Sequence, residues 1–209
     1  MGAGGNHERE REREAEPEVV GHRGQVKDEE LDHEAEARRR LALAQIRQYP
    51  DPVLRMRANE IERFDEDLRR LVERMTALMK DARGVGLAAT QVGVLQRVFV
   101  LQLDSEQEPA AVVNPRISVR SEEITSDDEG CLSLQGVTVP VERSLAVTLE
   151  GSNPQGDDVR LELEGLSARV AQHELDHLDG VLILDRTTTD ARREAMGALR
   201  PQPVTGAFS

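Results

Sequence analysis

Two helical patterns separated by a long stretch of β character most constrain the fold of this chain. Between Asp65 and Arg83, apolar residues recur at three- and four-residue steps, as in a helix with one buried face. After Gly93 the pattern changes to short β-branched and apolar runs, until a second helical pattern spans Leu166–Leu178. A helix, then many strands, then a helix predicts an α+β domain.

The expected strands lie between clusters of turn-forming residues such as Asn114-Pro115. A further short strand is expected at Val181–Leu184, and a last short helix at Ala191–Leu199. The other candidate strands are Arg97–Leu103, Val112–Val113, Ile117–Val119, Val137–Val141, Leu145–Leu149 and Val159–Leu163.

Residues 1–44 differ in composition from the rest of the chain. They are dense in charge, with Glu and Arg alternating through His7–Glu18, and no aromatic residue comes before Tyr49. Such a segment cannot bury enough apolar surface to offset the entropy of ordering, so we expect a disordered or loosely helical extension. The folded domain is expected to cover residues 45–190, and residues 191–209 a short helix and tail.

Composition and charge exclude several classes of protein. The net charge of −13 opposes binding to nucleic acid, and the lack of tryptophan makes base stacking unexpected. No apolar run approaches the roughly 18 residues of a membrane span, and the glutamate-rich N-terminus is unlike a targeting peptide. The single cysteine, Cys131, cannot form an intramolecular disulfide, which fits the reducing cytoplasm or a thiol used in chemistry.

The second helical segment contains His173-Glu174-Leu175-Asp176-His177. Histidines four residues apart lie on one helix face, so both imidazoles can bind one metal ion. Glu174 can then reach a metal-bound water and move its proton. The alternative is a surface helix with two solvated histidines. The apolar neighbours Val170 and Leu178 favour a packed helix, in which buried histidines need a partner.

A catalytic metal site needs a third protein ligand, which leaves the fourth position for water. The other histidines, His7, His22 and His33, all lie in the N-terminal extension, and none follows His177. Cys131 is the remaining candidate, because a thiolate is a strong ligand for zinc or ferrous iron. A lone cysteine is more often a small buried apolar residue, so this assignment depends on the histidine pair.

The segment Gly84–Gly93 is rich in glycine and alanine, which allow a ligand to approach the backbone closely. It lacks the lysine of a phosphate-binding loop, and its spacing is not that of a dinucleotide fingerprint. Gln91 offers an amide donor suited to an oxyanion. On composition alone, a plain tight turn is the favoured interpretation of this segment.

Taken together and in this order, the motifs resemble those of the peptide deformylase family. Gly84–Gln91 resembles the family's first motif (GφGφAAxQ), Glu129–Ser133 matches the second (EGCLS), and Gln172–Gly180 matches the third (QHExDHLxG). Tyr49–Arg55 also resembles the proline-rich opening of the family. The resemblance covers Gln45 to Thr187 without a long insertion, as in the compact bacterial class.

The resemblance implies a hydrolase that removes the N-formyl group from formyl-methionine at the start of nascent polypeptides and releases formate. It implies mixed or antiparallel sheets packed around a central helix that carries the HExxH motif. Cys131, His173 and His177 would bind one divalent metal ion, Fe²⁺ in the cell, replaceable by Zn²⁺, Ni²⁺ or Co²⁺. The implied partners are formyl-methionyl peptides and, transiently, the ribosome, with no nucleic-acid or membrane binding, in the cytoplasm.

The resemblance also implies individual roles. Glu174 would take a proton from the metal-bound water and deliver it to the leaving amine. Gln91 and the backbone N–H of Leu132 would stabilise the oxyanion. The residues expected to contact the substrate are Val85, Gly86 and Gly130 beside its backbone and Val170 at its methionine side chain.

Two positions depart from the family pattern. Gln135 replaces a common proline, and Thr138 stands where some members have a substrate-contacting arginine, which puts substrate affinity in question. Two other functions are alternatives. A zinc endopeptidase would use the same helix with a ligand other than Cys131, and a catalytically silent relative would bind partners through the charged N-terminal extension.

Overall fold

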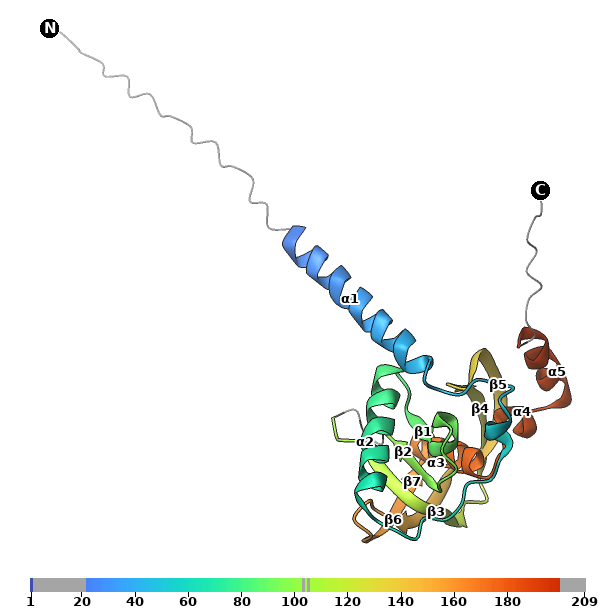
Figure 1. Cartoon of the computed structure of the whole chain (residues 1–209). Coiled ribbons are helices and arrows are strands. Elements are labelled where there is room, and N and C mark those ends of the chain that lie inside the picture. The colour runs from blue at the N-terminus through green and yellow to red at the C-terminus, as the bar shows by residue number, and fades with distance from the viewer. Residues whose placement is uncertain (2–21, 103, 105, 200–209) are drawn as a thin grey trace, which may run out of the picture. The chain divides into compact units, whose positions relative to one another are not determined.

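The computed structural model describes residue 1 and residues 22–102, 104 and 106–199. The chain divides into two compact units, Met1–Ala35 and Glu36–Ser209. Helix α1, His22–Leu43, begins in the first unit and ends in the second (Figure 1). The N-terminal extension is therefore helical from His22, whereas its residues 2–21 lie outside the described part. Opposite charges three residues apart, as in Glu36 and Arg39, support such a helix.

The folded core begins slightly before residue 45. Ala42 and Leu43 are buried and belong to the same apolar cluster as Ile46. These apolar residues follow the charged run Arg38–Arg40, so the sequence changes from charged to apolar within the last turn of α1.

Five strands form one antiparallel sheet in the order β1-β2-β3-β6-β7. Its register pairs Gly86 with Leu101 and Leu149 with Leu161. Strand β1 therefore lies at an edge of this sheet. The strands are β1 Gly86–Ala88, β2 Val98–Leu101, β3 Ala110–Arg120, β6 Ala146–Ser152 and β7 Asp158–Glu164.

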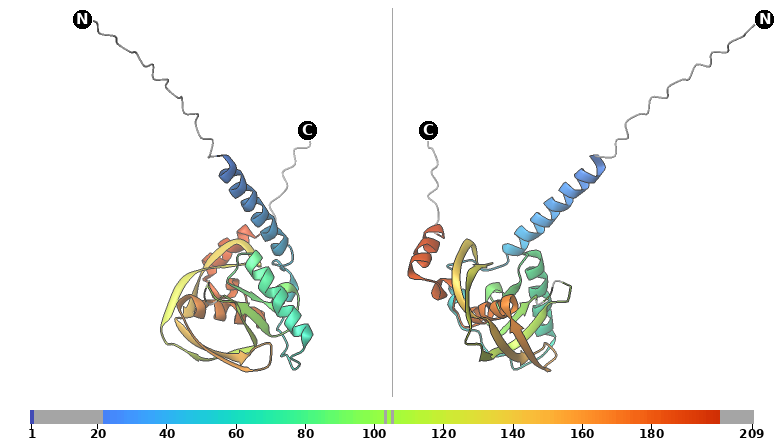
Figure 2. Two further views of the ribbon diagram at one scale, coloured as in Figure 1. Left: turned by 90° about the vertical axis from the view of Figure 1, so that its left-hand side faces the viewer. Right: turned by 180° about the vertical axis from the view of Figure 1, so that it is seen from behind.

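A second sheet consists of β4, Ile124–Cys131, and β5, Leu134–Ser144, paired antiparallel. The register shifts between Gly130 and Cys131, where the chain turns. Val137, Val139 and Val141 alternate with exposed residues along β5, so one face of this hairpin is buried. Helix α5, Thr189–Ala198, packs against β5 (Figures 1 and 2).

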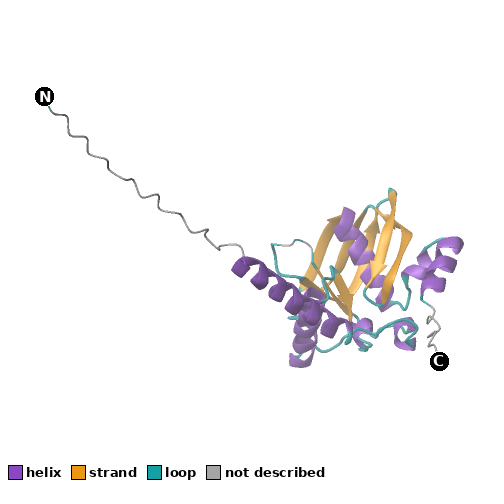
Figure 3. Ribbon diagram, turned by 90° about the horizontal axis from the view of Figure 1, so that it is seen from above, coloured by secondary structure: helices purple, strands orange, loops and turns teal. Residues whose placement is uncertain are grey.

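Helices α2, Glu66–Asp81, and α3, Gly165–Leu178, match the two predicted helices to within two residues. Asp65 caps α2 by accepting a hydrogen bond from the backbone N–H of Leu68. Met75 and Met79 of α2 are fully buried, as expected for core residues. Helix α3 contacts strands of both sheets, and Figure 3 shows the strands grouped together with helices around them.

The predicted α+β class with antiparallel sheets is confirmed, but the predicted strand at Val181–Leu184 is wrong. The residues expected to form a strand at Val181–Leu184 instead lead into a short helix, α4, Ile183–Arg186. Here Leu182, Ile183 and Leu184 are buried against β5, so an apolar run that resembles a strand fills a core as a helical turn. The short 3-10 helices η1, Pro52–Arg55, and η2, Ala89–Val92, complete the described elements. No described helix is long and apolar enough to cross a membrane.

Candidate active site

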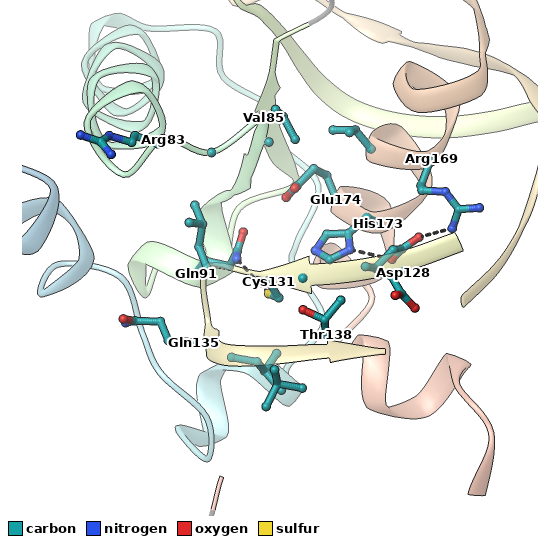
Figure 4. A pocket seen from close by; sticks show the side chains of 18 of the residues that line it. Arg83, Val85, Gln91, Asp128, Cys131, Gln135, Thr138, Arg169, His173 and Glu174 are labelled. Atoms are coloured by element: carbon teal, nitrogen blue, oxygen red, sulfur yellow. Dashed lines mark hydrogen bonds and ion pairs between the residues drawn. The ribbon is translucent and has the colours of Figure 1, made fainter. Parts of the chain in front are cut away.

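A pocket of about 510 Å³ brings together the three sequence motifs. Its walls come from β1 and the residues before it, from the β4–β5 hairpin and from α3 (Figure 4). All four predicted substrate-contacting residues line it: Val85, Gly86, Gly130 and Val170. Gln135 and Thr138, the two departures from the family pattern, line it too.

Three potential metal ligands converge beside this pocket, which two of them, Cys131 and His173, line directly. The thiol of Cys131, at the end of β4, and the imidazoles of His173 and His177, on α3, have ligand atoms within 4.8 Å of one another. Cys131 Sγ lies 3.2 Å from His177 Nε2. The two histidine side chains are almost entirely buried, so their nitrogens must be satisfied inside the protein.

The donor set fits a divalent metal ion. His173 Nδ1 lies 2.9 Å from Glu129 Oε2, an orientation that leaves Nε2 for a metal. Within the described part of the chain, His177 Nδ1 is buried without a hydrogen-bond partner. Burial lowers the pKa of His177 well below its ordinary value, and a neutral imidazole is the form that binds metals. One sulfur and two nitrogens suit zinc or ferrous iron.

The electrostatics of His173 also favour a cation at this position. Burial acts to lower its pKa, but hydrogen bonds with Cys131 and Glu129 outweigh burial and raise the pKa well above the ordinary value. The Cys131 thiol and the Glu129 carboxylate therefore flank the His173 imidazole. A divalent ion bound there would replace that proton, since metal ions and protons compete for the same lone pairs.

The Glu129 carboxylate holds the His173 imidazole in this arrangement. Burial acts to raise the pKa of its carboxyl, but hydrogen bonds from His173 and Arg143 lower it to about 2. The Glu129 carboxylate accepts hydrogen bonds from both Arg143 and Arg169, with N···O distances of 2.8 to 2.9 Å. The carboxylate is therefore ionised at neutral pH and fixes the ring of His173.

Glu174 is buried beside the ligands and lines the pocket. Among the described residues, its Oε2 has no hydrogen-bond partner. Burial raises the pKa of this carboxyl to about 7, with nearby Glu129 adding to the shift and His173 opposing it. A Cβ placed on Gly86 would lie 2.3 Å from Glu174 Oε1, so only glycine fits opposite this carboxylate. A carboxyl with a pKa near neutrality can both accept and donate a proton.

Gln91 lies in η2, where it is 1% exposed. Its Oε1 accepts from the backbone N–H of Ala88 at 2.8 Å, which orients the amide. Its Nε2 donates to Ser133 Oγ at 3.1 Å and lies 3.8 Å from Cys131 Sγ. The second N–H of the amide therefore points towards the metal ligands, where it donates to Cys131 Sγ.

The loop that contains Leu132 is held from outside the three motifs. Gln48 Nε2 donates to the Leu132 carbonyl at 2.9 Å, and the Tyr49 N–H donates to the Ser133 carbonyl at 2.9 Å. Leu132 lines the pocket directly after Cys131. The proline-rich opening of the domain thus positions the backbone beside the metal ligands.

Sequence reasoning missed the buried ion pairs behind the site. Arg143 and Arg169 are only 5% and 8% exposed. Arg169 precedes His173 by four residues, on the same face of α3. An arginine on a buried helix requires an acidic partner. That signal could have predicted a buried carboxylate, which the structure shows to be Glu129.

Comparison with known proteins decides the family. The family model for polypeptide deformylase matches residues 43–193. This chain belongs to the polypeptide deformylase family. It is therefore related to hydrolases, and its described fold agrees with theirs.

Individual relatives of the deformylase family cover most of this chain. A peptide deformylase of Desulforudis audaxviator is 43% identical over 154 residues, which is 74% of this chain and 99% of the relative. The crystal structure of peptide deformylase from Thermotoga maritima superposes with a TM-score of 0.66 at 48% identity, covering 68% of this chain and 96% of that chain. A peptide deformylase from Synechococcus elongatus in complex with actinonin gives a TM-score of 0.70 at 38% identity, covering 73% of this chain and 85% of that one.

Proposed function

We propose that this chain hydrolyses the formyl amide of formyl-methionyl peptides at the Cys131, His173 and His177 site, with Glu174 moving the protons. The observation that carries the proposal is the convergence of these ligand atoms within 4.8 Å beside a buried carboxyl. Family membership supports the reaction, since the matched family is that of polypeptide deformylases. Formate and a peptide with a free amino group would be the products.

The substrate would bind as an extended chain along the unpaired edge of β1. Val85 and Gly86 line the pocket at the edge of the five-stranded sheet, where backbone groups can pair with an added strand. Gly86 would hold the reacting amide beside Glu174, and Gly130, which lines the same pocket, would also contact the substrate backbone. Val170 offers an apolar contact for the methionine side chain.

Cys131, His173 and His177 would hold one divalent ion, which when bound would polarise the formyl carbonyl and acidify the attacking water. We propose Fe²⁺ in the cell, with Zn²⁺, Ni²⁺ or Co²⁺ able to substitute, because the donor set suits all four ions. Glu174 takes a proton from the water as its oxygen bonds to the formyl carbon. It then gives that proton to the amide nitrogen as the C–N bond breaks.

The developing oxyanion would be stabilised by the Gln91 amide and the backbone N–H of Leu132. Replacing Gln91 with alanine removes one of these donors, so we expect kcat to fall about 100-fold with little change in KM. Steady-state formate release measures both constants. Gln45→Ala is a matched control, because Gln45 is an exposed amide that bonds only within its own segment. A large KM effect with unchanged kcat would contradict the assigned role.

The overall proposal is tested by formate release from a formyl-Met tripeptide, with an acetyl-Met tripeptide for comparison. We expect the metal-loaded protein to release formate and to leave internal peptide bonds uncut. Cys131→Ser should lose most of its bound metal, since a hydroxyl is a much poorer ligand than a thiolate. Absence of turnover with a fully metal-loaded protein would refute the proposal, and full metal occupancy in Cys131→Ser would refute the ligand set.

We further propose that the substrates are nascent chains in the cytoplasm and that contact with the ribosome is transient. The net charge of −13 supports a brief encounter, because an acidic surface is repelled by ribosomal RNA.

A further inference from the structure

Two arginines lie at one end of the active-site pocket. Arg39 belongs to the last turns of α1, and Arg83 follows α2. Both line the pocket together with Leu43 and Gly84. The match to the deformylase family begins at residue 43, so Arg39 lies just before the matched region.

Packing places the two arginines at the same end. Leu43 and Ala82 are buried in one apolar cluster, and Leu132 packs against it. Arg39 precedes Leu43 by one helical turn on the same face of α1, and Arg83 directly follows Ala82. Figure 4 shows Arg83 on the side of the pocket away from Arg169 and Asp128.

Neither arginine has a strong acidic partner in the described part of the chain. Arg39 Nε is buried without a hydrogen-bond partner, and its ion pair is a 3.7 Å contact with Glu36. Both side chains of that pair are about two-fifths exposed, so the pair contributes little. Arg83 is exposed and forms no ion pair with any described residue. Both guanidinium groups are therefore free to bind a carboxylate, which they can do through two parallel hydrogen bonds.

The geometry of β1 indicates which part of a peptide would reach these arginines. In the proposed mode of binding, the reacting amide would lie at Gly86, where a Cβ would come within 2.3 Å of Glu174 Oε1. The far end of the strand is closed, because Ala88, Ala89 and Thr90 are completely buried. The peptide must therefore leave past Val85, which is 48% exposed, towards Arg83. At about 3.3 Å per extended residue, its third residue would arrive there.

We propose that Arg39 and Arg83 form a carboxylate-binding subsite for the third residue of the substrate. The carboxylate has two possible sources, an acidic side chain at that residue or the C-terminus of a formylated tripeptide. This proposal rests on the deformylase function proposed above, and it adds a substrate preference that depends on a helix outside the matched family region.

The test compares kcat/KM of the metal-loaded full chain for four formylated tripeptides at low salt. Formyl-Met-Ala-Glu-amide and formyl-Met-Ala-Gln-amide differ only in the side-chain carboxylate. Formyl-Met-Ala-Gln with a free C-terminus tests the main-chain carboxylate, and formyl-Met-Ala-Lys-amide tests repulsion. We expect at least one carboxylate to raise kcat/KM about tenfold over the Gln amide, mainly through KM, with the effect shrinking as salt increases.

Arg39→Gln and Arg83→Gln should each reduce this ratio, and the double variant should bring it close to one. Arg40→Gln is the matched control, because Arg40 is an exposed arginine of α1 that does not line the pocket. Equal kcat/KM for all four peptides, or a preference that survives in the double variant, would overturn the subsite. Deformylation of the Gln amide by the unaltered protein shows in the same experiment that the underlying function holds.

Discussion

Glu174→Gln is expected to abolish turnover while leaving the metal bound. Glutamine keeps the size of the side chain but cannot accept the proton of the attacking water. General acid–base catalysis contributes roughly 100- to 10,000-fold to the rate of such reactions, so we expect kcat to fall by at least about 100-fold. Metal content by elemental analysis and formate release on the same sample measure the two effects. Turnover near that of the unaltered protein would remove Glu174 from its proposed role.

The same substitution should stabilise the metal-free protein at alkaline pH. The pKa of buried Glu174 is raised from an ordinary 4.5 to about 7. The folded protein therefore holds this proton more tightly than the unfolded chain does. The contribution of the carboxyl to stability is fully present below pH 4.5 and is lost as pH rises through 7. The loss is about 3 kcal/mol, and glutamine does not suffer it. The free energy of unfolding of Glu174→Gln should therefore exceed that of the unaltered protein at pH 8, but hardly differ at pH 4.5.

This outcome separates catalysis from stability at one residue. A carboxyl that lowers stability at working pH is retained for its chemistry. Equal free energies of unfolding for Glu174→Gln and the unaltered protein at pH 8 would show that ionised Glu174 does not destabilise the folded protein. Bound metal should reduce the difference, because a nearby cation favours the ionised carboxylate.

The sequence was most informative where a pattern is local. The period of apolar residues predicted α2, which buries one face, and also α3, which is buried on most sides from Ala168 to Leu178. The proposed ligands followed from a histidine pair within one helical turn and the lone Cys131, and the structure brings these three side chains together.

The sequence was least informative where tertiary contacts determine the structure. Strand β1 contains glycine and alanine, which have low strand propensity, and it forms because its backbone pairs with β2. Strand β4 was missed because most of its side chains are polar and exposed. The contribution of Arg39 to the pocket could not be predicted either, since no local pattern shows where the end of α1 packs.

Glu129→Gln is expected to destabilise the fold and weaken metal binding together. Glu129 is 5% exposed and accepts hydrogen bonds from Arg143, Arg169 and His173. Removing its charge leaves two buried guanidinium groups short of a partner, which typically costs about 3–5 kcal/mol. Losing the carboxylate that orients His173 should also weaken metal affinity about 10- to 100-fold. Denaturant unfolding and metal titration measure the two effects.

Asp127→Asn provides the matched control, because Asp127 pairs with the same Arg169 but its side chain is 65% exposed. That substitution should change stability by less than about 1 kcal/mol and leave metal affinity unchanged.

The pH dependence of stability gives a second check on the role of Glu129. The pKa of Glu129 is lowered to about 2, so its stabilisation is present above pH 4.5 and lost as pH falls towards 2. Glu129→Gln should lack this acid-sensitive component.

A double variant, Glu129→Gln with Arg143→Met, distinguishes the two roles of this carboxylate. Replacing Arg143 removes a buried cation that has lost one of its two carboxylate partners. Its other partner, Asp176, still pairs with Arg186, so part of the lost stability should return. Metal affinity should stay low, because no carboxylate orients His173 in either variant. If metal affinity recovered together with stability, Glu129 would act on the metal site only by keeping the protein folded. If stability recovered alone, its contact with His173 would be a distinct contribution to the metal site.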